Sequence, residues 1–407
     1  MGPAPPRRVA IIGGGIAGLT AAQELRRGGF GGEIVLVDPG PLSYDRPPLS
    51  KVAFAAGAPI ESLALAEPDA FAALRLDARY GRRATALDAG AGRVTLDDGT
   101  TVPADAIVLA TGARARRLPF PGADHPRVFV LREYGDAAGL RAAVAAAPGG
   151  RVVVVGAGLI GAELASSLLD AGAAVTLLDH LELPMAHVLG AELATYLHDM
   201  HAAHGVDVRI GGIARVETEG EGLVAVLADG ERLRATAVVL GAGIIPAAEL
   251  AAAAGAETIP GGGVLVDAQY RTAVPGLYAI GDVAVPRDDP DRPGHWEAAR
   301  LDGAAVAAVI LGGEPAPPGA PWFWSDRYGI HLEVVGRLVG EGEPVRRPGE
   351  RPAWFLVDGG LLVGAASIDD PNTVRGARRI IDQRVPVVAA ELADPAVPLR
   401  DLLRRGR

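Results

Sequence analysis

Short runs of consecutive apolar residues alternate along the chain with longer segments that have helical periodicity. Residues 9–12, 34–37 and 152–155 are apolar throughout and rich in valine and isoleucine, apart from Ala10 and Leu36. Uniformly apolar runs of this length are typical of parallel strands that are covered on both faces. The alternation of such strands with helices therefore predicts an α/β fold built on parallel sheets.

Two of the strand-like runs lead into the same glycine pattern. A lone GxGxxG is weak evidence, but each copy here stands between a predicted strand and a predicted helix, as a dinucleotide-binding loop requires. The first copy contains Gly13, Gly15, Ala17 and Gly18, and the second contains Gly156, Gly158, Leu159, Ile160 and Gly161.

An acidic residue follows each glycine loop at the end of the next strand. Asp38 comes after the first loop and Asp179 after the second, each at the distance that the dinucleotide fingerprint requires. A carboxylate in this place accepts hydrogen bonds from ribose hydroxyls. No arginine follows Asp179 closely, and a 2′-phosphate would meet negative charge there, so we expect NAD rather than NADP at the second loop.

The two glycine loops belong to two related units. Residues 107–112 and 238–243 are strand-like, end in glycine turns, and follow their respective loops at similar distances. Residues 277–282 then return to the first unit. We predict two Rossmann-like dinucleotide-binding domains, one inserted in the other. Their expected bounds are residues 1–113 with 245–320, and residues 114–244.

A third, smaller domain is expected after the proline-rich linker 315–321. Residues 321–407 contain strand-like segments at 331–335 and 354–357 and a helix at 374–382, for which Asn372 is the predicted N-cap. This predicts a small α+β domain.

Composition excludes several classes of protein. The 407 residues carry a net charge of −10, which argues against a nucleic-acid partner. The longest apolar stretch is interrupted by glycines and Glu163, so we expect no membrane span and a cytoplasmic protein. There is no cysteine, which excludes disulfides, thiolate metal sites and thiol-based reductases.

Lys51 is the only lysine among 39 basic residues. A chain that otherwise uses arginine retains lysine where a compact point charge is needed. We therefore predict that Lys51 contacts a cofactor.

Two further clusters have competing interpretations. His198, His201 and His204 follow a three-residue spacing, which favours a solvated helix face over a metal site. Residues 322–324, Trp-Phe-Trp, form either core or a surface where electrons leave, and we favour core.

The combined motifs resemble the oxygenase-coupled NADH:ferredoxin reductases, a glutathione-reductase-like family that includes reductases of Rieske dioxygenase systems. The resemblance runs from about residue 8 to the C-terminus. Beyond the glycine loops it rests on residues 46–51 (Arg-Pro-Pro-Leu-Ser-Lys), 110–112 (Ala-Thr-Gly), Glu163, 281–282 (Gly-Asp) and 321–326 (Pro-Trp-Phe-Trp-Ser-Asp). The first and last of these segments are the most specific.

The resemblance implies FAD in the first unit and NADH in the second. NADH would deliver a hydride to FAD N5, and the reduced flavin would pass single electrons to a ferredoxin that serves a P450 or a Rieske oxygenase. Lys51 and Glu163 would form a pair near N5, with Trp296 close to the flavin and nicotinamide. The remaining implied cofactor residues are Arg46, Ala110, Thr111, Gly112, Gly281 and Asp282 for FAD and Gly243 for NAD.

The resemblance also implies a small acidic iron–sulfur partner, and a monomer or weak homodimer. Residues 371–407 contain eight arginines against four acids, so this basic tail, Trp296 and Trp322 are candidates for the partner-binding face. The chain departs from the family pattern at Pro39 and Gly294, and it has an acidic loop at residues 288–291. These differences bear on the identity of the electron acceptor. A rubredoxin-type reductase, an NADH oxidase, and a non-catalytic NADH-sensing flavoprotein resembling apoptosis-inducing factor are the alternatives.

Overall fold

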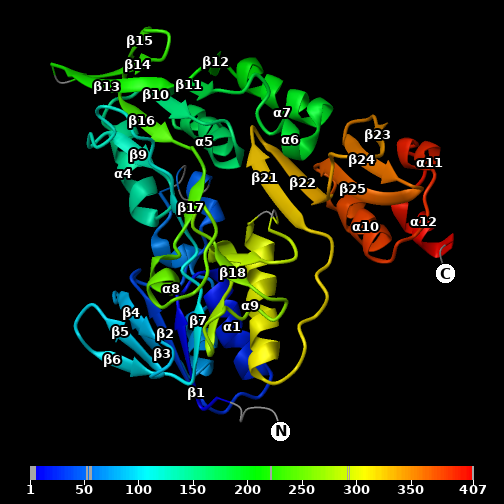
Figure 1. Cartoon of the computed structure of the whole chain (residues 1–407). Helices are drawn as coiled ribbons and strands as arrows, with labels where there is room; N and C mark the ends of the chain where they lie inside the picture. The colour runs from blue at the N-terminus through cyan, green and yellow to red at the C-terminus, as the bar shows by residue number, and fades with distance from the viewer. Residues whose placement is uncertain are drawn as a thin grey trace. The chain divides into compact units, whose positions relative to one another are not determined.

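The computed structural model describes residues 6–51, 54, 57–220, 222–290, 292 and 294–405 (Figure 1). Asp291, in the predicted acidic loop, and Arg407, in the basic tail, lie outside the described residues. The chain divides into two compact units. Unit 1 comprises Met1–Pro47, Ala58–Arg114 and Ile244–Pro317, and unit 2 comprises Pro48–Gly57, Ala115–Gly243 and Pro318–Arg407. Residues 48–57 therefore belong with the second glycine loop.

Unit 1 is built on a five-stranded parallel sheet, as the apolar runs predict. Its strand order is β19-β7-β1-β2-β3, so the strand before the first glycine loop lies at the centre. The strands are β1 (Arg8–Ile12), β2 (Glu33–Asp38), β3 (Asp77–Tyr80), β7 (Ala106–Leu109) and β19 (Leu277–Ala279).

Alternate side chains of β1 pack into two different cores. Val9 and Ile11 pack with residues of helices α1 (Ile16–Arg27) and α9 (Trp296–Ile310). Ala10 and Ile12 pack in a second cluster with residues of the antiparallel sheet β4-β5-β6. Burial on both faces explains why the sequence of this strand is uniformly apolar. The other elements are β4 (Ala84–Asp88), β5 (Arg93–Leu96), β6 (Thr101–Pro103), η2 (Ile60–Leu63), α3 (Pro68–Ala73), β17 (Ile244–Pro246), α8 (Glu249–Ala253), β18 (Val264–Val266), η3 (Gly281–Val283) and β20 (Ala284–Pro286).

Unit 2 repeats this plan around the second glycine loop. The parallel sheet has the order β12-β11-β10-β16-β9, and an antiparallel sheet β13-β14-β15 packs with it in one core. The strands are β9 (Val128–Val130), β10 (Arg151–Val155), β11 (Ala174–Asp179), β12 (Asp207–Ile210), β13 (Ile213–Glu219), β14 (Gly222–Leu227), β15 (Arg232–Ala235) and β16 (Ala237–Leu240), and the helices are α4 (Tyr134–Ala145), α5 (Leu159–Asp170), α6 (Ala186–Leu189) and α7 (Ala191–Ala203). Two short elements, η1 (Pro47–Ser50) and β8 (Ala113–Ala115), stand where the chain passes from unit 1 to unit 2.

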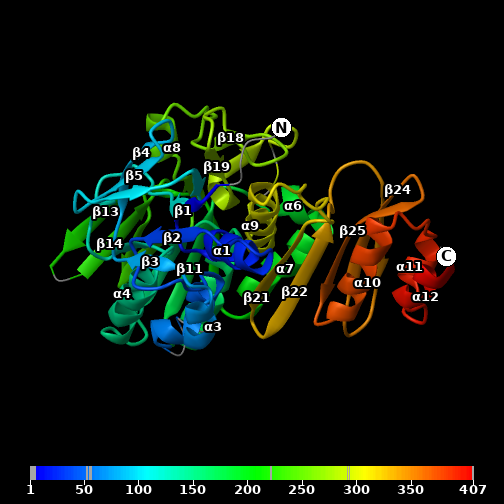
Figure 2. The same cartoon turned by 90° about the horizontal axis from the view of Figure 1, so that it is seen from below.

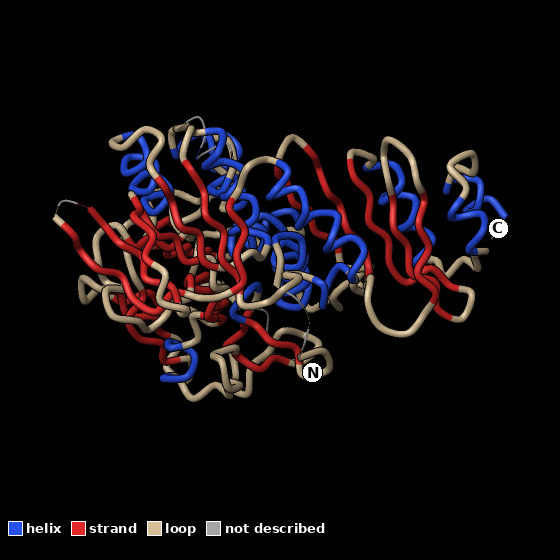
Figure 3. Tube along the Cα trace, turned by 90° about the horizontal axis from the view of Figure 1, so that it is seen from above, coloured by secondary structure: helices blue, strands red, loops and turns tan. Residues whose placement is uncertain are grey.

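The C-terminal segment of unit 2 is an antiparallel sheet of order β21-β22-β25-β24-β23 with helices beside it (Figures 2 and 3). This agrees with the predicted α+β architecture. Its strands are β21 (Trp322–Arg327), β22 (Ile330–Gly336), β23 (Glu343–Arg347), β24 (Ala353–Asp358) and β25 (Leu361–Ile368), and its helices are α10 (Pro371–Asp382), α11 (Ala389–Ala393) and α12 (Leu399–Arg405).

Both faces of the C-terminal sheet are covered within unit 2. Val335 packs in one core with residues of α10, α11 and α12, such as Ile380. Leu332 and Val334 pack in another core with α6 and α7, through residues such as Leu193. The C-terminal sheet therefore shares a hydrophobic core with helices α6 and α7 of the same unit.

Helix α10 begins two residues earlier than its predicted cap requires. The N-cap is Asp370, whose carboxylate accepts hydrogen bonds from the backbone N–H and hydroxyl of Thr373. Pro371 occupies the first turn, where its missing N–H is not needed. Asn372 is exposed inside this turn, so its predicted capping role is wrong.

The histidine cluster differs from expectation, whereas Trp322 and Phe323 of the aromatic cluster pack against hydrophobic cores as expected. His201 is 1% exposed, so a solvated face is wrong for this residue, whereas His204 is exposed. Trp322, Phe323 and Trp324 are half-buried, and the ring centroids of the two tryptophans stack 5.1 Å apart. The buried tryptophan of this sheet is Trp354, which is 5% exposed.

Among the described residues, no helix is long and apolar enough to cross a membrane.

Candidate functional site

The first glycine loop leaves the N-terminus of α1 open to an anion. Gly15 is the N-cap, no side chain caps the helix, and the first turn contains no acid. Gly13 has φ +114°, and a Cβ at Gly18 would lie 2.0 Å from the Gly13 carbonyl oxygen. Free N–H groups and the helix dipole therefore point to a place that suits a diphosphate.

The second glycine loop has the same geometry at the start of α5. Gly156 has φ +104°, and a Cβ at Gly161 would lie 1.9 Å from the Gly156 carbonyl oxygen. Gly158 is the N-cap, again without a side-chain cap, and no described atom lies within 4 Å of the place a Cβ would take. Leu159 and Ile160 form the first turn. Both loops fit a bound dinucleotide.

The two acidic residues hold the backbone of their glycine loops. Asp38 Oδ2 accepts a hydrogen bond of 2.6 Å from the Gly14 N–H, and Asp179 Oδ2 accepts one of 2.8 Å from the Ala157 N–H. The other carboxylate oxygen of Asp179 accepts from the Leu181 N–H at 2.9 Å. Each carboxylate is thereby fixed beside its loop, where the fingerprint places the ribose.

Arg46 lies over the first glycine loop within unit 1. A Cβ at Gly15 would lie 3.1 Å from Arg46 Nη1, and the guanidinium stacks over Tyr44, 5.3 Å from the ring centroid. A guanidinium beside an uncapped helix N-terminus adds to the positive potential there. Arg46 is therefore placed to lie against a dinucleotide at this loop, as the resemblance implied for FAD.

The other predicted residues of unit 1 lie at the ends of its strands and helices. Ala110, Thr111 and Gly112 follow β7, and the Thr111 hydroxyl donates to the Ala247 carbonyl at 2.7 Å. Gly281 and Asp282 form η3, where the buried carboxylate of Asp302 accepts a hydrogen bond of 3.0 Å from the Gly281 N–H.

Trp296 is the first residue of α9 and is half-buried. Its indole N–H donates to Asp45 Oδ1 at 2.7 Å. This hydrogen bond fixes the ring and joins the start of α9 to the segment that contains Arg46. Gly243, the last predicted residue, follows β16 in unit 2 and has φ +88°.

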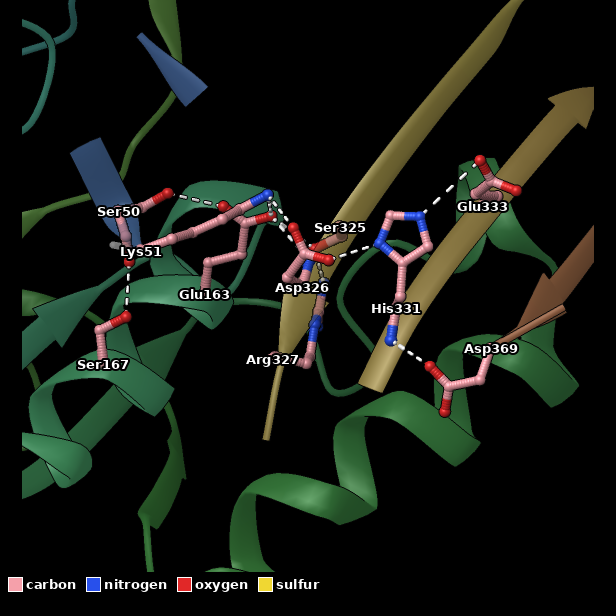
Figure 4. Close-up of polar contacts among 10 residues, drawn as sticks. All are labelled: Ser50, Lys51, Glu163, Ser167, Ser325, Asp326, Arg327, His331, Glu333 and Asp369. Atoms are coloured by element: carbon pink, nitrogen blue, oxygen red, sulfur yellow. Dashed lines mark hydrogen bonds and ion pairs between the residues drawn. The ribbon is translucent and has the colours of Figure 1, made fainter. Parts of the chain in front are cut away.

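Lys51 lies in a charged cluster within unit 2 (Figure 4). Its Nζ is 3.2 Å from Glu163 Oε1 and 2.5 Å from Asp326 Oδ2, and its side chain is 15% exposed. The ammonium also lies 5.4 Å from the centroid of the Trp324 ring. The pair with Glu163 is therefore present, with a second carboxylate that the sequence did not assign.

Glu163 is the buried centre of this cluster. It lies on α5, five residues after the N-cap Gly158, and is 5% exposed. Its carboxylate accepts hydrogen bonds from the hydroxyls of Ser50 at 2.6 Å and Ser325 at 2.8 Å, and from the Asp326 N–H at 3.2 Å. Hydrogen bonds and the ammonium together compensate the buried charge.

Asp326 connects Lys51 to the surface of the unit. Its second oxygen, Oδ1, lies 2.5 Å from His331 Nδ1, and the side chain of His331 is 40% exposed. Burial alone would raise the pKa of Asp326, but the hydrogen bonds and charges of Lys51 and His331 hold it below its ordinary value.

A buried histidine on α7 pairs with a half-buried tyrosine in the turn between β21 and β22. His201 Nδ1 is 2.6 Å from the Tyr328 hydroxyl. Burial, with smaller contributions from Arg327 and the neighbouring histidines, lowers the pKa of His201 to about 3. Burial also raises the pKa of Tyr328. Both groups are therefore neutral near pH 7 and hold the C-terminal sheet to α7.

Sequence reasoning missed the residues that hold the predicted ones in place. Asp326 stood inside the quoted motif 321–326 but was given no role, and nothing in the local pattern singled out Asp45, Asp302 or His331. For two of these residues the partner is far away in the sequence: Asp45 binds Trp296 and Asp326 binds Lys51. Only an alignment or a structure joins such pairs.

Comparison with protein families matches two models to the chain. The model described as pyridine nucleotide-disulphide oxidoreductase matches residues 7–303, and the model described as reductase C-terminal matches residues 322–403.

Several characterised proteins are similar to the chain over nearly their whole length. The ferredoxin reductase component of chlorobenzene dioxygenase from Cupriavidus sp. (strain PS12) is 37% identical, with 97% of each chain covered. Putidaredoxin reductase from Pseudomonas putida is 34% identical over 98% of this chain and 97% of its own.

Solved structures give the same result. The putidaredoxin reductase in a covalent complex with putidaredoxin has a TM-score of 0.91 and 32% identity, covering 98% of this chain and 99% of the other. A ferredoxin reductase from Rhodopseudomonas palustris also has a TM-score of 0.91 and 32% identity, covering 97% and 99%.

Proposed function

Because the chain belongs to the pyridine nucleotide-disulphide oxidoreductase family, we propose that it is an FAD-dependent NADH:ferredoxin reductase. The observation that carries this proposal is the pairing of two dinucleotide loops with a reductase C-terminal domain in a chain without cysteine. A thiol-based reductase needs a redox-active cysteine, so electrons that reach the flavin must leave it by another route. Transfer to a small iron–sulfur protein is such a route.

FAD and NAD(H) are the cofactors of this family, in agreement with the two that the sequence predicted. Bound FAD supplies hydride acceptance and one-electron donation, and the protein supplies binding, orientation and charge. We assign FAD to the loop at Gly13–Gly18, because Arg46 adds a cation to that loop. NADH is assigned to the loop at Gly156–Gly161, with Asp179 on its ribose.

The proposed role of Lys51 is to stabilise negative charge that develops on the reduced flavin. An ammonium held by two carboxylates is well ordered, and its position does not change when charge develops. Glu163 keeps the ammonium in place and is itself fixed by Ser50 and Ser325. Trp296, anchored to Asp45, is proposed to lie beside the flavin and nicotinamide.

The proposed acceptor is a small acidic ferredoxin that serves a P450 or Rieske oxygenase. Helix α10 presents Arg375 and Arg379 as exposed cations, whereas Arg378 is half-buried and paired with Asp382 at 4.0 Å. Electron-transfer encounters are small and are steered by charge. Arg375 and Arg379 are therefore the residues of the basic tail that we assign to the docking face. We also propose a monomer or weak homodimer in the cytoplasm.

Reduction of a ferredoxin by NADH tests this function directly. The purified protein loaded with FAD is mixed with NADH and either a ferredoxin or a rubredoxin from the host, with cytochrome c as terminal acceptor. We expect turnover that depends on added ferredoxin. Fast oxygen consumption without ferredoxin would indicate an NADH oxidase, turnover with rubredoxin alone a rubredoxin-type reductase, and a long-lived reduced flavin without turnover a non-catalytic NADH sensor.

A further inference from the structure

A chain of three ionisable groups leads from the only lysine to solvent within unit 2 (Figure 4). Lys51 Nζ donates to Asp326 Oδ2 at 2.5 Å, and Asp326 Oδ1 lies 2.5 Å from His331 Nδ1. Lys51 is 15% exposed and His331 is 40% exposed. One carboxylate is therefore shared between a nearly buried ammonium and an imidazole that solvent can protonate.

We propose that Asp326 and His331 are positioning residues for Lys51, and that protonation of His331 changes the electrostatic environment of the Lys51 ammonium through Asp326. This coupling does not involve the docking partner. Its consequence for the flavin rests on the proposed function of Lys51.

The hydrogen bond between Asp326 and His331 determines which nitrogen of the imidazole carries a proton. An ionised Asp326 can only accept, so Nδ1 of His331 carries the proton in their hydrogen bond. In the neutral imidazole Nε2 is then the unprotonated nitrogen, and it lies 3.7 Å from Glu333 Oε1. Adding a proton at Nε2 creates a cation between the carboxylates of Asp326 and Glu333.

The groups that face His331 come from three elements. Asp326 lies on β21, and Glu333 lies on the same strand as the histidine, β22. Asp369 follows β25, and its Oδ1 accepts a hydrogen bond of 2.8 Å from the His331 backbone N–H. All three are acids, and Lys51 is the cation on the far side of Asp326. A change of charge on the His331 ring therefore occurs next to Asp326, the carboxylate that also pairs with Lys51.

Two cations that share one carboxylate compete for its charge. When His331 is neutral, Asp326 compensates mainly Lys51. When His331 is protonated, the carboxylate is divided between the imidazolium and the ammonium, so the net positive potential around Nζ rises. Histidine is the side chain that changes charge between pH 5 and 8. A flavin that responds to Lys51 would consequently be easier to reduce at the acid end of this range.

Because Lys51 is the only lysine of the sequence, NMR can observe its side chain directly. Protein grown with lysine labelled with ¹³C at Cε gives one lysine side-chain resonance, because the chain contains no other lysine. We expect the chemical shift of this resonance to move as the pH of the FAD-loaded protein is changed from 8 to 5. A resonance that stays constant across this interval in the wild-type protein overturns the proposal.

Substitution identifies the responsible group. His331→Asn places an amide N–H near the position of Nδ1 but does not titrate, so the movement of the Lys51 resonance should be lost. The matched control is His187→Asn, because His187 is an exposed histidine on α6 of the same unit. Persistence of the movement in His331→Asn, or its loss in His187→Asn, contradicts the proposal.

The reduction potential of bound FAD distinguishes a failure of the His331–Lys51 coupling from a failure of the proposed role of Lys51 at the flavin. We expect the difference in potential between wild type and His331→Asn to be larger at pH 5.5 than at pH 8. If the Lys51 resonance follows His331 but the two potentials stay equal at both values, the coupling holds and the proposed role of Lys51 at the flavin is wrong. If the resonance does not follow His331, the coupling itself is wrong.

Discussion

Glu163 brings together the polar groups that surround Lys51. Its buried carboxylate accepts from two serine hydroxyls and a backbone N–H and pairs with one ammonium. A buried ion pair of this kind contributes little compared with an apolar substitute, but removing one partner leaves an uncompensated charge. The cluster therefore makes Lys51 important for the stability of unit 2 as well as for the proposed chemistry.

Replacement of Lys51 by methionine should destabilise the protein. We expect the free energy of unfolding to fall by about 3 kcal/mol, because Glu163 loses its cation in a site from which water is largely excluded. Urea unfolding of Lys51→Met and of the double variant Lys51→Met, Glu163→Gln measures this, and the double variant should recover part of the loss. The control is Arg8→Met, since the Arg8–Glu33 pair is about half exposed and should change stability by less than about 1 kcal/mol. Equal effects at the two sites would contradict the role of burial.

We expect coenzyme preference to depend on a single residue, Asp179. Asp179 is held beside the second glycine loop by the Ala157 and Leu181 N–H groups. Asp179→Asn removes the charge that would repel a 2′-phosphate, and we expect the ratio of kcat/KM for NADH to that for NADPH to fall about tenfold, or about 1.4 kcal/mol. Steady-state kinetics with both coenzymes measure it, with the nearby exposed Glu182→Gln as control. A wild-type preference for NADPH would refute the assignment.

Helix α10 shows how one residue sets the start of an element. Asp370 accepts two hydrogen bonds from Thr373, and the next residue is Pro371. Asn372 is also a residue type that caps helices, which explains the prediction of Asn372 as the N-cap. The helix begins at the earlier one because proline fits its first turn.

Removal of this cap should lower stability by a measurable amount. Asp370→Ala is expected to lower the free energy of unfolding by about 1 kcal/mol, because an orphan N–H of the first turn loses its acceptor. Asn372→Ala is the matched control and should have almost no effect. Thermal or urea unfolding monitored by circular dichroism gives both values. A larger effect at Asn372 than at Asp370 would restore the original prediction.

Helix α7 contains a buried histidine that makes stability depend on pH. The folded-state pKa of His201 is about 3, against 6.5 when the residue is exposed. The unfolded chain therefore binds a proton below pH 6.5 that the folded chain does not bind. The contribution of His201 to stability is fully present above this value and decreases as the pH falls toward about 3.

The variant His201→Gln should remove this pH dependence. Between pH 7 and pH 5 we expect the wild type to lose about 2 kcal/mol more stability than the variant, from about 1.4 kcal/mol for each pH unit below the unfolded pKa. Urea unfolding at the two pH values measures the difference. His187→Gln serves as control, since that histidine is exposed and its replacement should leave the pH dependence unchanged.

Charge is unevenly distributed over the whole molecule. The net charge is −10, yet residues 371–407 carry a local charge of +4, so the rest of the chain carries −14. An acidic partner would be repelled by most of the surface and attracted to the C-terminal helices. Such an arrangement selects an orientation at long range and is sensitive to salt.

Charge reversal at the exposed arginines of α10 tests this arrangement. Arg375→Glu combined with Arg379→Glu should raise the KM for ferredoxin about tenfold at low salt and weaken its dependence on salt. Reduction of ferricyanide, which needs no protein docking, should be unchanged. The control reverses two other exposed arginines, Arg27 and Arg234, which are 74% and 86% exposed. An equal KM for both pairs would exclude α10 as the docking face.

The sequence alone predicted the elements whose formation depends on residues close together in the chain. The β1 and β10 strands, their glycine loops and the acids Asp38 and Asp179 follow from runs and spacings that each lie within one strand–helix–strand segment. Parallel strands buried on both faces are uniformly apolar, and glycine is required where φ is positive or backbones approach closely. The family resemblance added the Lys51–Glu163 pair, while the three predicted domains and the roles of the site residues stay predictions.

Tertiary structure decided what depends on residues far apart in the chain. Lys51 is separated from Asp326 by 275 residues, and Trp296 from Asp45 by 251, so no local pattern could pair them. Packing likewise decided that His201 is buried beside Tyr328, that Trp324 stays half-buried, and that residues 48–57 join unit 2. The sequence determined two dinucleotide loops and their strands, because backbone sterics and strand burial act over short distances. Folding determined which charges meet, because side-chain neighbours are set by how the sheets and helices pack.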